Sequence, residues 1–181
     1  MPVLARLLDE FGPETPSSNP KHDLAIALCR YKLMLADGTP AQIIPGRLSL
    51  GSIGSAFNEA GLKEAGITHI LCLCENVRVR FPESFVYKRV ILSDDGSESS
   101  AMHLQQRLTE CLDFIDEAQV CLVHCAQGKS RSAAVVCAYL MLRQTLSFQQ
   151  ALDLVRIFRP IAEPNPSFAR ILQLLSHSTQ A

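Results

Sequence analysis

The spacing of apolar residues separates a short first part of the chain from a longer second part. Between Leu4 and Phe11 the apolar residues recur at helical spacing, and a second apolar run extends from Leu24 to Leu35. Gly and Pro residues break the pattern after each run. We therefore predict two short helices joined by a flexible linker, which make residues 1–42 an N-terminal helical extension. Three interpretations of it stay open: packing on the outside of the main domain, partner docking or autoinhibition, and disorder of the first segment.

From Ile43 onward, short apolar runs alternate with amphipathic segments, a pattern typical of buried strands and helices. Ser99 or Ser100 is expected to cap one helix, and Ser147 with Gln150 has the pattern of a capping box at another. Strands are predicted over 47–51, 68–74, 85–92 and 120–124, and helices over 58–65, 101–117, 131–143, 148–159 and 166–175. This alternation indicates an α/β fold with a central, mostly parallel sheet of about five strands and helices on both faces.

Composition and charge limit the partners, cofactors and cellular location that we expect for this chain. The chain has 181 residues, 48% of them hydrophobic, and a formal net charge of −1. This balance gives no reason to expect nucleic acid or a membrane as a partner. Seven irregularly spaced cysteines favour a reducing compartment and match no zinc pattern, so we expect no metal or cofactor. Because we find no apolar run of about 18 residues and no signal peptide, we expect a cytoplasmic location, with the nucleus also open.

One segment combines the features of a phosphate-binding site. The apolar strand that ends at His124 is followed by a loop from Cys125 to Arg131, and then by a helix. In such a loop, successive backbone N–H groups turn inward and the helix N-terminus adds its positive end. Gly128 permits a tight turn, and the planar guanidinium of Arg131 can bind two phosphate oxygens. The sequence therefore predicts an anion cradle between this strand and this helix.

A cysteine at the base of such a cradle becomes a nucleophile. Inward N–H donors, a helix N-terminus and a guanidinium all stabilise the thiolate, and such surroundings lower a cysteine pKa from about 8.5 to roughly 3.5–7.5. The groups that bind phosphate therefore also activate Cys125. Attack on phosphorus would give a cysteinyl-phosphate, which water then hydrolyses.

The segment from His124 to Ser132 resembles the H-C-x-x-G-x-x-R-S/T loop of the protein tyrosine phosphatase superfamily, and its ending resembles the dual-specificity branch. Similarity continues in Ile44–Gly51, Leu62–Leu73 and Pro164–Phe168. The resemblance implies a catalytic domain over residues 43–178, of the small atypical type. It implies hydrolysis of phosphotyrosine and phosphoserine/threonine in phosphorylated protein substrates, without a cofactor.

The superfamily takes its proton donor from an aspartate on a loop about 30 residues before the cysteine. Asp94 and Asp95 stand side by side at that distance from Cys125. A donor is needed because the leaving oxygen departs poorly unless it is protonated as the P–O bond breaks. Counting from Tyr87 in the preceding strand favours Asp94, and Asp95 stays the alternative.

The resemblance also implies supporting roles around the loop. His124 would hold the loop by hydrogen bonds, and Ser132 would offer its hydroxyl to the sulfur. The alternatives are an ordinary core histidine and a helix cap. Asn165 is expected to order a turn beside the site rather than to touch the substrate. The backbone of the loop would bind the phosphate through Ala126, Gln127, Gly128, Lys129 and Ser130, together with Arg131.

Cys74 is a candidate redox partner of Cys125. It ends a strand that we expect beside the strand over 120–124. In some members of the superfamily, a cysteine at this place traps the oxidised nucleophile as a disulfide, which prevents irreversible oxidation. The alternative is a small apolar core residue.

Two other classes of function stay open. One is a phosphatase of a non-protein ester: a phosphoinositide, a glucan phosphate or an RNA 5′ end. Lipid phosphatases of the superfamily usually carry a basic residue after the cysteine, where Ala126 stands, and RNA-directed relatives usually end the loop in N-R-T. The other is a module that binds phosphate without cleaving it. Inactive relatives typically lose the cysteine or the arginine, whereas Cys125 and Arg131 are both present.

Overall fold

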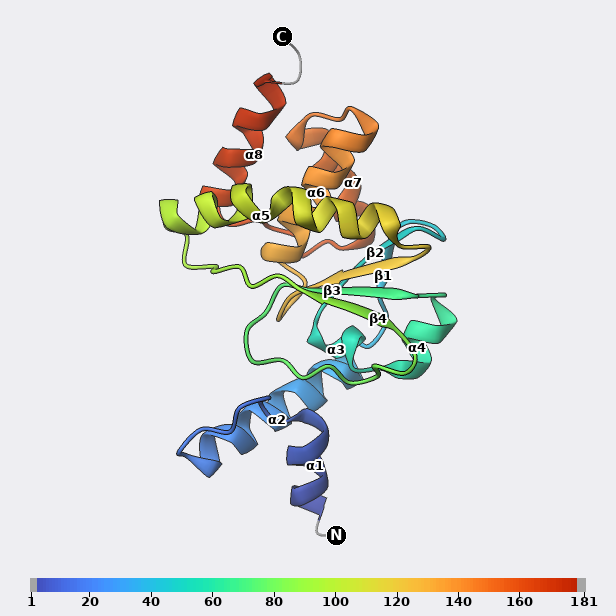
Figure 1. Cartoon of the computed structure of the whole chain (residues 1–181), viewed down its shortest axis with the longest axis vertical. Coiled ribbons are helices and arrows are strands. Elements are labelled where there is room, and N and C mark those ends of the chain that lie inside the picture. Colours follow the sequence, from blue (N-terminus) through green and yellow to red (C-terminus); the bar gives the residue numbers. More distant parts are fainter. Residues whose placement is uncertain (1–2, 179–181) are drawn as a thin grey trace.

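The central sheet has five strands in the order β1-β2-β5-β3-β4 in the computed structural model, which describes residues 3–178 (Figure 1). Only the pair β1 and β2 is antiparallel, and the other neighbours are parallel. This arrangement confirms the predicted α/β fold with a mostly parallel sheet of about five strands. The strands are β1 (Ala41–Ile44), β2 (Leu48–Gly51), β3 (His69–Cys72), β4 (Val86–Arg89) and β5 (Cys121–His124).

Strand β1 lies outside the predicted strands. It has four residues, of which only Ile43 is buried, so it leaves no apolar run in the sequence. A turn that contains Gly46, at φ 67°, brings β1 back along β2. Such a positive φ is readily adopted by glycine, which explains the short antiparallel connection.

Helices cover both faces of the sheet, as predicted (Figure 1). Helix α3 packs on β2 and β5, whereas α5 packs on β3, α6 on β2 and β5, and α7 on β1. In Figure 1, α5 to α8 lie above the sheet, and α1 to α4 lie below it. The bounds are α1 (Val3–Phe11), α2 (Pro20–Ala36), α3 (Ile53–Ala56), α4 (Glu59–Glu64), α5 (Glu98–Glu117), α6 (Arg131–Gln144), α7 (Phe148–Phe158) and α8 (Pro166–Ser178).

The first residues of α5 and α7 are set by their N-cap residues, one of which differs from the prediction. Ser147 and Gln150 form the predicted capping box of α7. The cap of α5 is Ser97 rather than Ser99 or Ser100, because Ser97 has extended backbone and its hydroxyl accepts the N–H of Ser100 at 3.1 Å. Ser100 is instead buried inside the first turn of the helix.

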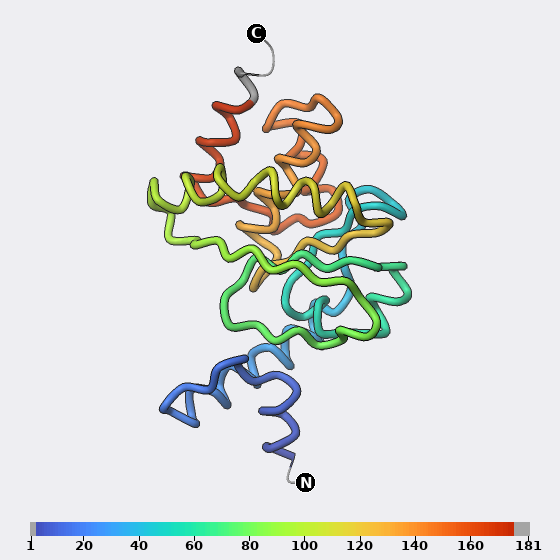
Figure 2. Tube along the Cα trace, in the orientation of Figure 1, coloured from blue at the N-terminus to red at the C-terminus, as the bar shows by residue number. Residues whose placement is uncertain are grey.

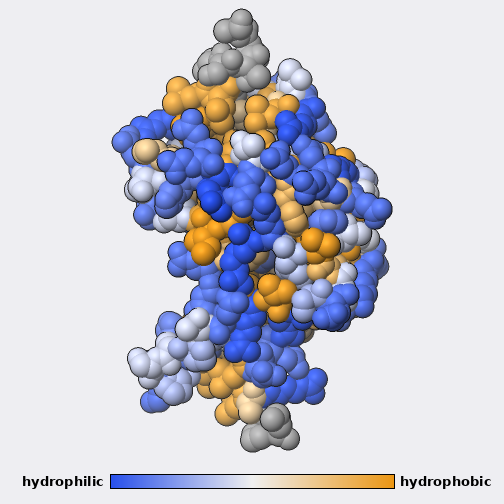
Figure 3. Space-filling model, in the orientation of Figure 1, coloured by the Kyte–Doolittle hydropathy of each residue, from blue (hydrophilic) through white to orange (hydrophobic). Residues whose placement is uncertain are grey.

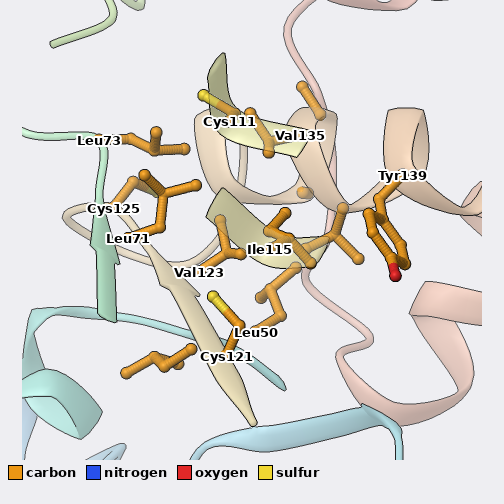
Figure 4. Close-up of a cluster of buried hydrophobic side chains, with 14 of the residues drawn as sticks. Leu50, Leu71, Leu73, Cys111, Ile115, Cys121, Val123, Cys125, Val135 and Tyr139 are labelled. Atoms are coloured by element: carbon orange, nitrogen blue, oxygen red, sulfur yellow. The ribbon is translucent and has the colours of Figure 1, made fainter. Parts of the chain in front are cut away.

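The core fixes the two elements that flank the predicted cradle. Every residue of β5 is buried, and the first ten residues of α6 after Arg131 are buried as well. Figure 4 shows how strand side chains meet those of α5 and α6 in this cluster. Strand β3 runs beside β5, with Cys72 opposite His124, as expected for the strand that leads to Cys74. The loop between β5 and α6 is therefore anchored at both ends by buried secondary structure.

The chain has helices at both predicted places in its first part. Asn19 caps α2, and Pro20 occupies the first turn, where its missing N–H costs nothing. The side chain of Phe11 is buried. The centroid of its ring lies 5.3 Å from the ring centroid of Tyr31 and 5.9 Å from that of Phe57. Helices α1 and α8 lie at opposite ends of the molecule (Figure 2).

The face shown in Figure 3 is mostly hydrophilic, with hydrophobic residues in separate patches. Apolar atoms make up a large share of the surface of ordinary folded proteins. Within residues 3–178, no helix is both long enough and apolar enough to cross a bilayer.

Candidate active site

The loop between β5 and α6 forms the floor of a cavity of about 580 Å³. Cys125 lies at its base, with only 2% of its surface exposed. The cavity is also lined by Asp94, by residues 163–165, which precede α8, and by Pro166, the first residue of α8. The structure thus brings together the predicted nucleophile, the predicted arginine and one predicted aspartate around one cavity.

Four backbone carbonyl groups of this loop accept hydrogen bonds from donors outside it. In a planar trans peptide, the N–H points away from the C=O of the same unit. Tying the carbonyls outward therefore turns the following N–H groups, those of residues 127–130, toward the inside of the loop. The donors are the N–H of Ile53 for Ala126 (3.1 Å), the guanidinium of Arg159 for Gln127 (2.6 Å) and Gly128 (3.2 Å), and the N–H of Glu163 for Lys129 (2.8 Å).

Gly128 is required by the shape of the loop. Its φ is 64°, in the left-handed region. A Cβ at this position would lie 2.6 Å from the carbonyl oxygen of Gly51 and 2.8 Å from Nη2 of Arg159. Only glycine fits such a backbone so close to its neighbours.

The surroundings of Cys125 favour its thiolate. Its Sγ lies 3.2 Å from the hydroxyl of Ser132. Burial alone would raise the pKa of Cys125, but this burial effect is outweighed by the hydroxyl and N–H of Ser132, the charge of Arg131 and the N–H of Lys129. The pKa of Cys125 therefore lies below that of an ordinary cysteine, which makes it an effective nucleophile near neutral pH.

Arg131 lines the cavity and retains unused hydrogen-bonding capacity. Its Nη1 is only loosely engaged, at 3.4 Å from the carbonyl of Leu73 and 3.5 Å from that of Leu92. Its buried Nε donates no hydrogen bond, although Oδ2 of Asp94 lies 3.3 Å away. A guanidinium in this state has donors available for the oxygen atoms of an anion.

The structure separates the two adjacent aspartates. Oδ1 of Asp94 accepts hydrogen bonds from the hydroxyl of Ser130 at 2.6 Å and from the amide of Asn165 at 2.8 Å, so its carboxylate is held over the loop. Oδ1 of Asp95 accepts the N–H of Ser97 at 2.9 Å and so orders the turn that leads into α5. Of the two aspartates predicted as alternatives for the proton donor, Asp94 is therefore the one whose side chain contacts the loop.

Comparison with known proteins decides the family. The family model of the dual specificity phosphatase catalytic domain matches residues 48–178. The chain belongs to the dual specificity phosphatase family.

Individual relatives agree with this assignment. The chain is 43% identical over 148 residues to dual specificity protein phosphatase 1 of Arabidopsis thaliana, which covers 80% of this chain and 72% of the relative. It is 38% identical over 138 residues to dual specificity phosphatase 28 of Homo sapiens, which covers 74% and 76% of the two chains. The crystal structure of human DUSP28 matches with a TM-score of 0.67 at 34% identity, over 78% of this chain and 95% of that chain.

These comparisons confirm the resemblance and the prediction of a dual-specificity phosphatase. They support a cysteine-based phosphoric ester hydrolase and do not favour the two alternative classes. The residues before 48 lie outside the match to the family model.

The two residues predicted to support the loop, His124 and Ser132, have distinct surroundings. Ser132 is buried in α6 and its hydroxyl faces Cys125, whereas the N-cap of α6 is Ser130, so the helix-cap alternative for Ser132 finds no support. His124 is buried. Burial lowers its pKa, but the negative charges of Cys72 and Cys125 and their hydrogen bonds outweigh this effect and raise it above the usual value. A protonated His124 would in turn stabilise the neighbouring thiolates.

Cys74 stays a candidate redox partner. It is buried, and all seven cysteines are free in the structure. Interaction with Cys72, burial and the charge of Cys125 raise the pKa of Cys74, whereas Arg131 lowers it. The raised pKa favours the neutral thiol of Cys74, with Cys72 as the largest cause.

Sequence reasoning missed two polar residues at this site. Arg159 is buried and holds the loop carbonyls, and Asp37 pairs with it. No local signal identifies these two residues, because each acts on a segment far away in the sequence. Asn165 orders the turn, as expected, by accepting the N–H of Phe168, and it also contacts Asp94. The side chain of Lys129, in contrast, is half-exposed and pairs with Glu163 at 2.7 Å.

Proposed function

We propose that this chain dephosphorylates phosphotyrosine and phosphoserine/threonine in protein substrates, with Cys125 as nucleophile, Arg131 as phosphate ligand and Asp94 as general acid. The observation that carries the proposal is the sulfur of Cys125, which lies 3.2 Å from the hydroxyl of Ser132 beneath a loop whose outward-tied carbonyls turn its N–H groups inward. These surroundings lower the pKa of Cys125. Protein substrates are supported by the names of the relatives, among them dual specificity protein phosphatase 1. Ala126, which is not basic, follows the cysteine and speaks against phosphoinositides.

In the first step, the thiolate of Cys125 attacks phosphorus and the P–O bond to the substrate breaks. Asp94 gives its proton to the departing oxygen, while the guanidinium of Arg131 and the inward N–H groups hold the other phosphate oxygens. The products of this step are the dephosphorylated side chain and a cysteinyl-phosphate.

In the second step, water attacks the cysteinyl-phosphate. The carboxylate of Asp94 accepts a proton from the water, the P–S bond breaks, and inorganic phosphate leaves. The hydroxyl of Ser132, 3.2 Å from the sulfur, donates a hydrogen bond to the departing thiolate. This returns Asp94 and Cys125 to their starting states.

We also propose that residues 43–178 form the catalytic domain and residues 1–42 an N-terminal helical extension. The family match over 48–178 supports the first part. The seven free cysteines support a reducing compartment, and so a cytoplasmic location, with the nucleus also open.

The nucleophile is tested by turnover of p-nitrophenyl phosphate. We expect Cys125→Ser to abolish turnover, because a serine hydroxyl is not ionised at neutral pH, while the exposed Cys29→Ser serves as the matched control with full activity. Phosphopeptides carrying phosphotyrosine or phosphothreonine are then compared with phosphoinositides. Turnover that survives in Cys125→Ser contradicts the mechanism, and a preference for phosphoinositides contradicts the substrate class.

The general acid is tested by Asp94→Asn, with Asp95→Asn as the control. Loss of a general acid costs typically 10²- to 10⁴-fold in rate. We expect a loss of this order in kcat on phosphopeptides, whose leaving groups are poor, and a smaller loss on p-nitrophenyl phosphate. Asp95→Asn should retain activity, because its carboxylate bonds to Ser97. Equal losses in the two variants would overturn the assignment.

A further inference from the structure

Arg159 connects the catalytic loop to a residue outside the match to the family model. It follows α7, and only 7% of its surface is exposed. On one side, its Nη2 and Nε donate to the carbonyls of Gln127 and Gly128 at 2.6 and 3.2 Å. On the other side, Nη1 and Nη2 bind the two oxygens of Asp37, each at 2.6 Å. The bidentate pair joins residues 122 positions apart in the sequence.

Asp37 is held at the end of α2. Its backbone N–H caps the helix by donating to the carbonyl of Leu33 at 2.7 Å. Its own carbonyl accepts the hydroxyl of Ser52, which caps α3. The side chain of Asp37 therefore has a fixed origin, between the helical N-terminal segment and the body of the domain.

The charge of Asp37 makes this use of Arg159 feasible. A buried guanidinium that met only two carbonyl groups would carry an uncompensated charge, which is costly in a protein interior. The carboxylate of Asp37 neutralises that charge and fixes the plane of the guanidinium through two charge-assisted hydrogen bonds. With the plane fixed, Nη2 and Nε face the loop carbonyls.

We propose that Asp37 and Arg159 form a positioning pair that keeps the carbonyls of Gln127 and Gly128 turned outward. The N–H groups of Gly128 and Lys129 then face the phosphate and the thiolate of Cys125. The inference rests on the proposed function. It gives the end of α2, which precedes the family match, a role in positioning the catalytic loop. Displacement of Asp37 would therefore loosen the loop without changing any residue that touches the substrate.

The test compares Asp37→Asn and Asp37→Ala with the parent chain on p-nitrophenyl phosphate. A displacement of about 1 Å in a reacting geometry can cost ~10²-fold, so we expect kcat/KM to fall by roughly 10- to 100-fold. Inhibition by inorganic phosphate should weaken. The pH midpoint of inactivation by iodoacetate, which reports the thiol pKa of Cys125, should move upward. Asp37→Glu, which keeps the charge, should restore part of each quantity.

Glu14→Ala is the matched control. Glu14 also forms a two-oxygen ion pair between the N-terminal segment and the body of the domain, with Arg89 at 2.6 and 3.1 Å, but it does not contact the loop. We expect Glu14→Ala to leave the pH midpoint and phosphate inhibition unchanged. Thermal unfolding of each variant shows whether it is folded at the assay temperature.

Two outcomes overturn the inference. One is that Asp37→Asn and Asp37→Ala, folded, keep the parent pH midpoint and phosphate inhibition. The other is that Glu14→Ala changes both as much as Asp37→Ala does, since the pair would then only attach the segment. Either result leaves the proposed function standing if Cys125→Ser is inactive, so the two failures can be told apart.

Discussion

In the proposed mechanism, individual atoms at this site serve both phosphate binding and activation of Cys125. The N–H of Lys129 stabilises the sulfur of Cys125, and the same ring of N–H groups is available to a phosphate. The hydroxyl of Ser132, in the first turn of α6, has the sulfur of Cys125 as its hydrogen-bond partner. Ser132 is therefore the residue through which the thiolate can be altered with least effect on phosphate binding.

Removal of that hydroxyl should change the pH dependence of the enzyme. The thiolate is the reactive form, so activity falls as the pH drops below the pKa of Cys125, which Ser132 lowers. Ser132→Ala should raise this pKa and move the acidic limb of the kcat/KM profile to higher pH, with the largest loss of activity below the parent midpoint. The buried Ser49→Ala, on β2, is the control and should leave the limb in place. An unchanged limb in Ser132→Ala would show that the hydroxyl does not act on the thiolate.

Among the elements, the unit of β5, the loop and α6 has little freedom to change shape. Donors from α3, from Arg159 and from the segment before α8 fix the loop on its outer side. Gly128 lies where one of these donors, Arg159, and the carbonyl group of Gly51 in β2 come close to the loop backbone. A side chain at this point would have to push the loop inward or move Arg159.

Gly128→Ala should therefore abolish most activity and destabilise the fold. A non-glycine residue in a left-handed conformation costs of order 1–3 kcal/mol, and the close contact with Gly51 adds to it. Gly46→Ala is the matched control, because Gly46 has a similar φ of 67° but no atom within 4 Å of the added Cβ. Activity and urea unfolding are measured for both. If the two variants lost activity equally, backbone strain alone would explain the effect.

Features that depend on neighbouring residues in the sequence could be predicted, whereas features that depend on contacts between distant segments could not. Cys125, Gly128 and Arg131 belong to one continuous segment, so their spacing was enough to predict the cradle. Strand β3 was predictable because its apolar residues form a run, whereas β1, with one buried side chain, was not. The ion pair between Asp37 and Arg159 depends on the packing of α2 against the rest of the chain, which no local pattern records.

At the scale of the whole molecule, the core between the sheet and α5 to α8 keeps β5, the loop and α6 in place. Ile115 of α5 is fully buried in this core (Figure 4). Met102, on the same helix, has 56% of its surface exposed. A buried and an exposed residue of one helix therefore allow the contribution of the core to the free energy of unfolding to be measured.

Ile115→Ala should lower the free energy of unfolding by about 2–5 kcal/mol, the usual range for removing a large buried aliphatic side chain. Met102→Ala should stay within about 0.5 kcal/mol of the parent chain, as is usual on a surface. Urea unfolding followed by circular dichroism measures both. A small effect of Ile115→Ala would mean that the helix layer relaxes around the cavity, and that α6 is less firmly held than its burial indicates.

The outward ties on the loop carbonyls have a consequence for selectivity. Because the surrounding protein fixes the loop, its N–H groups cannot move inward to bind a smaller anion or outward to bind a larger one. Tetrahedral oxyanions close to phosphate in size and charge, such as vanadate, should therefore compete for the cavity, whereas planar anions such as nitrate would leave several amides unmatched. Discrimination by shape would then precede any chemistry at sulfur.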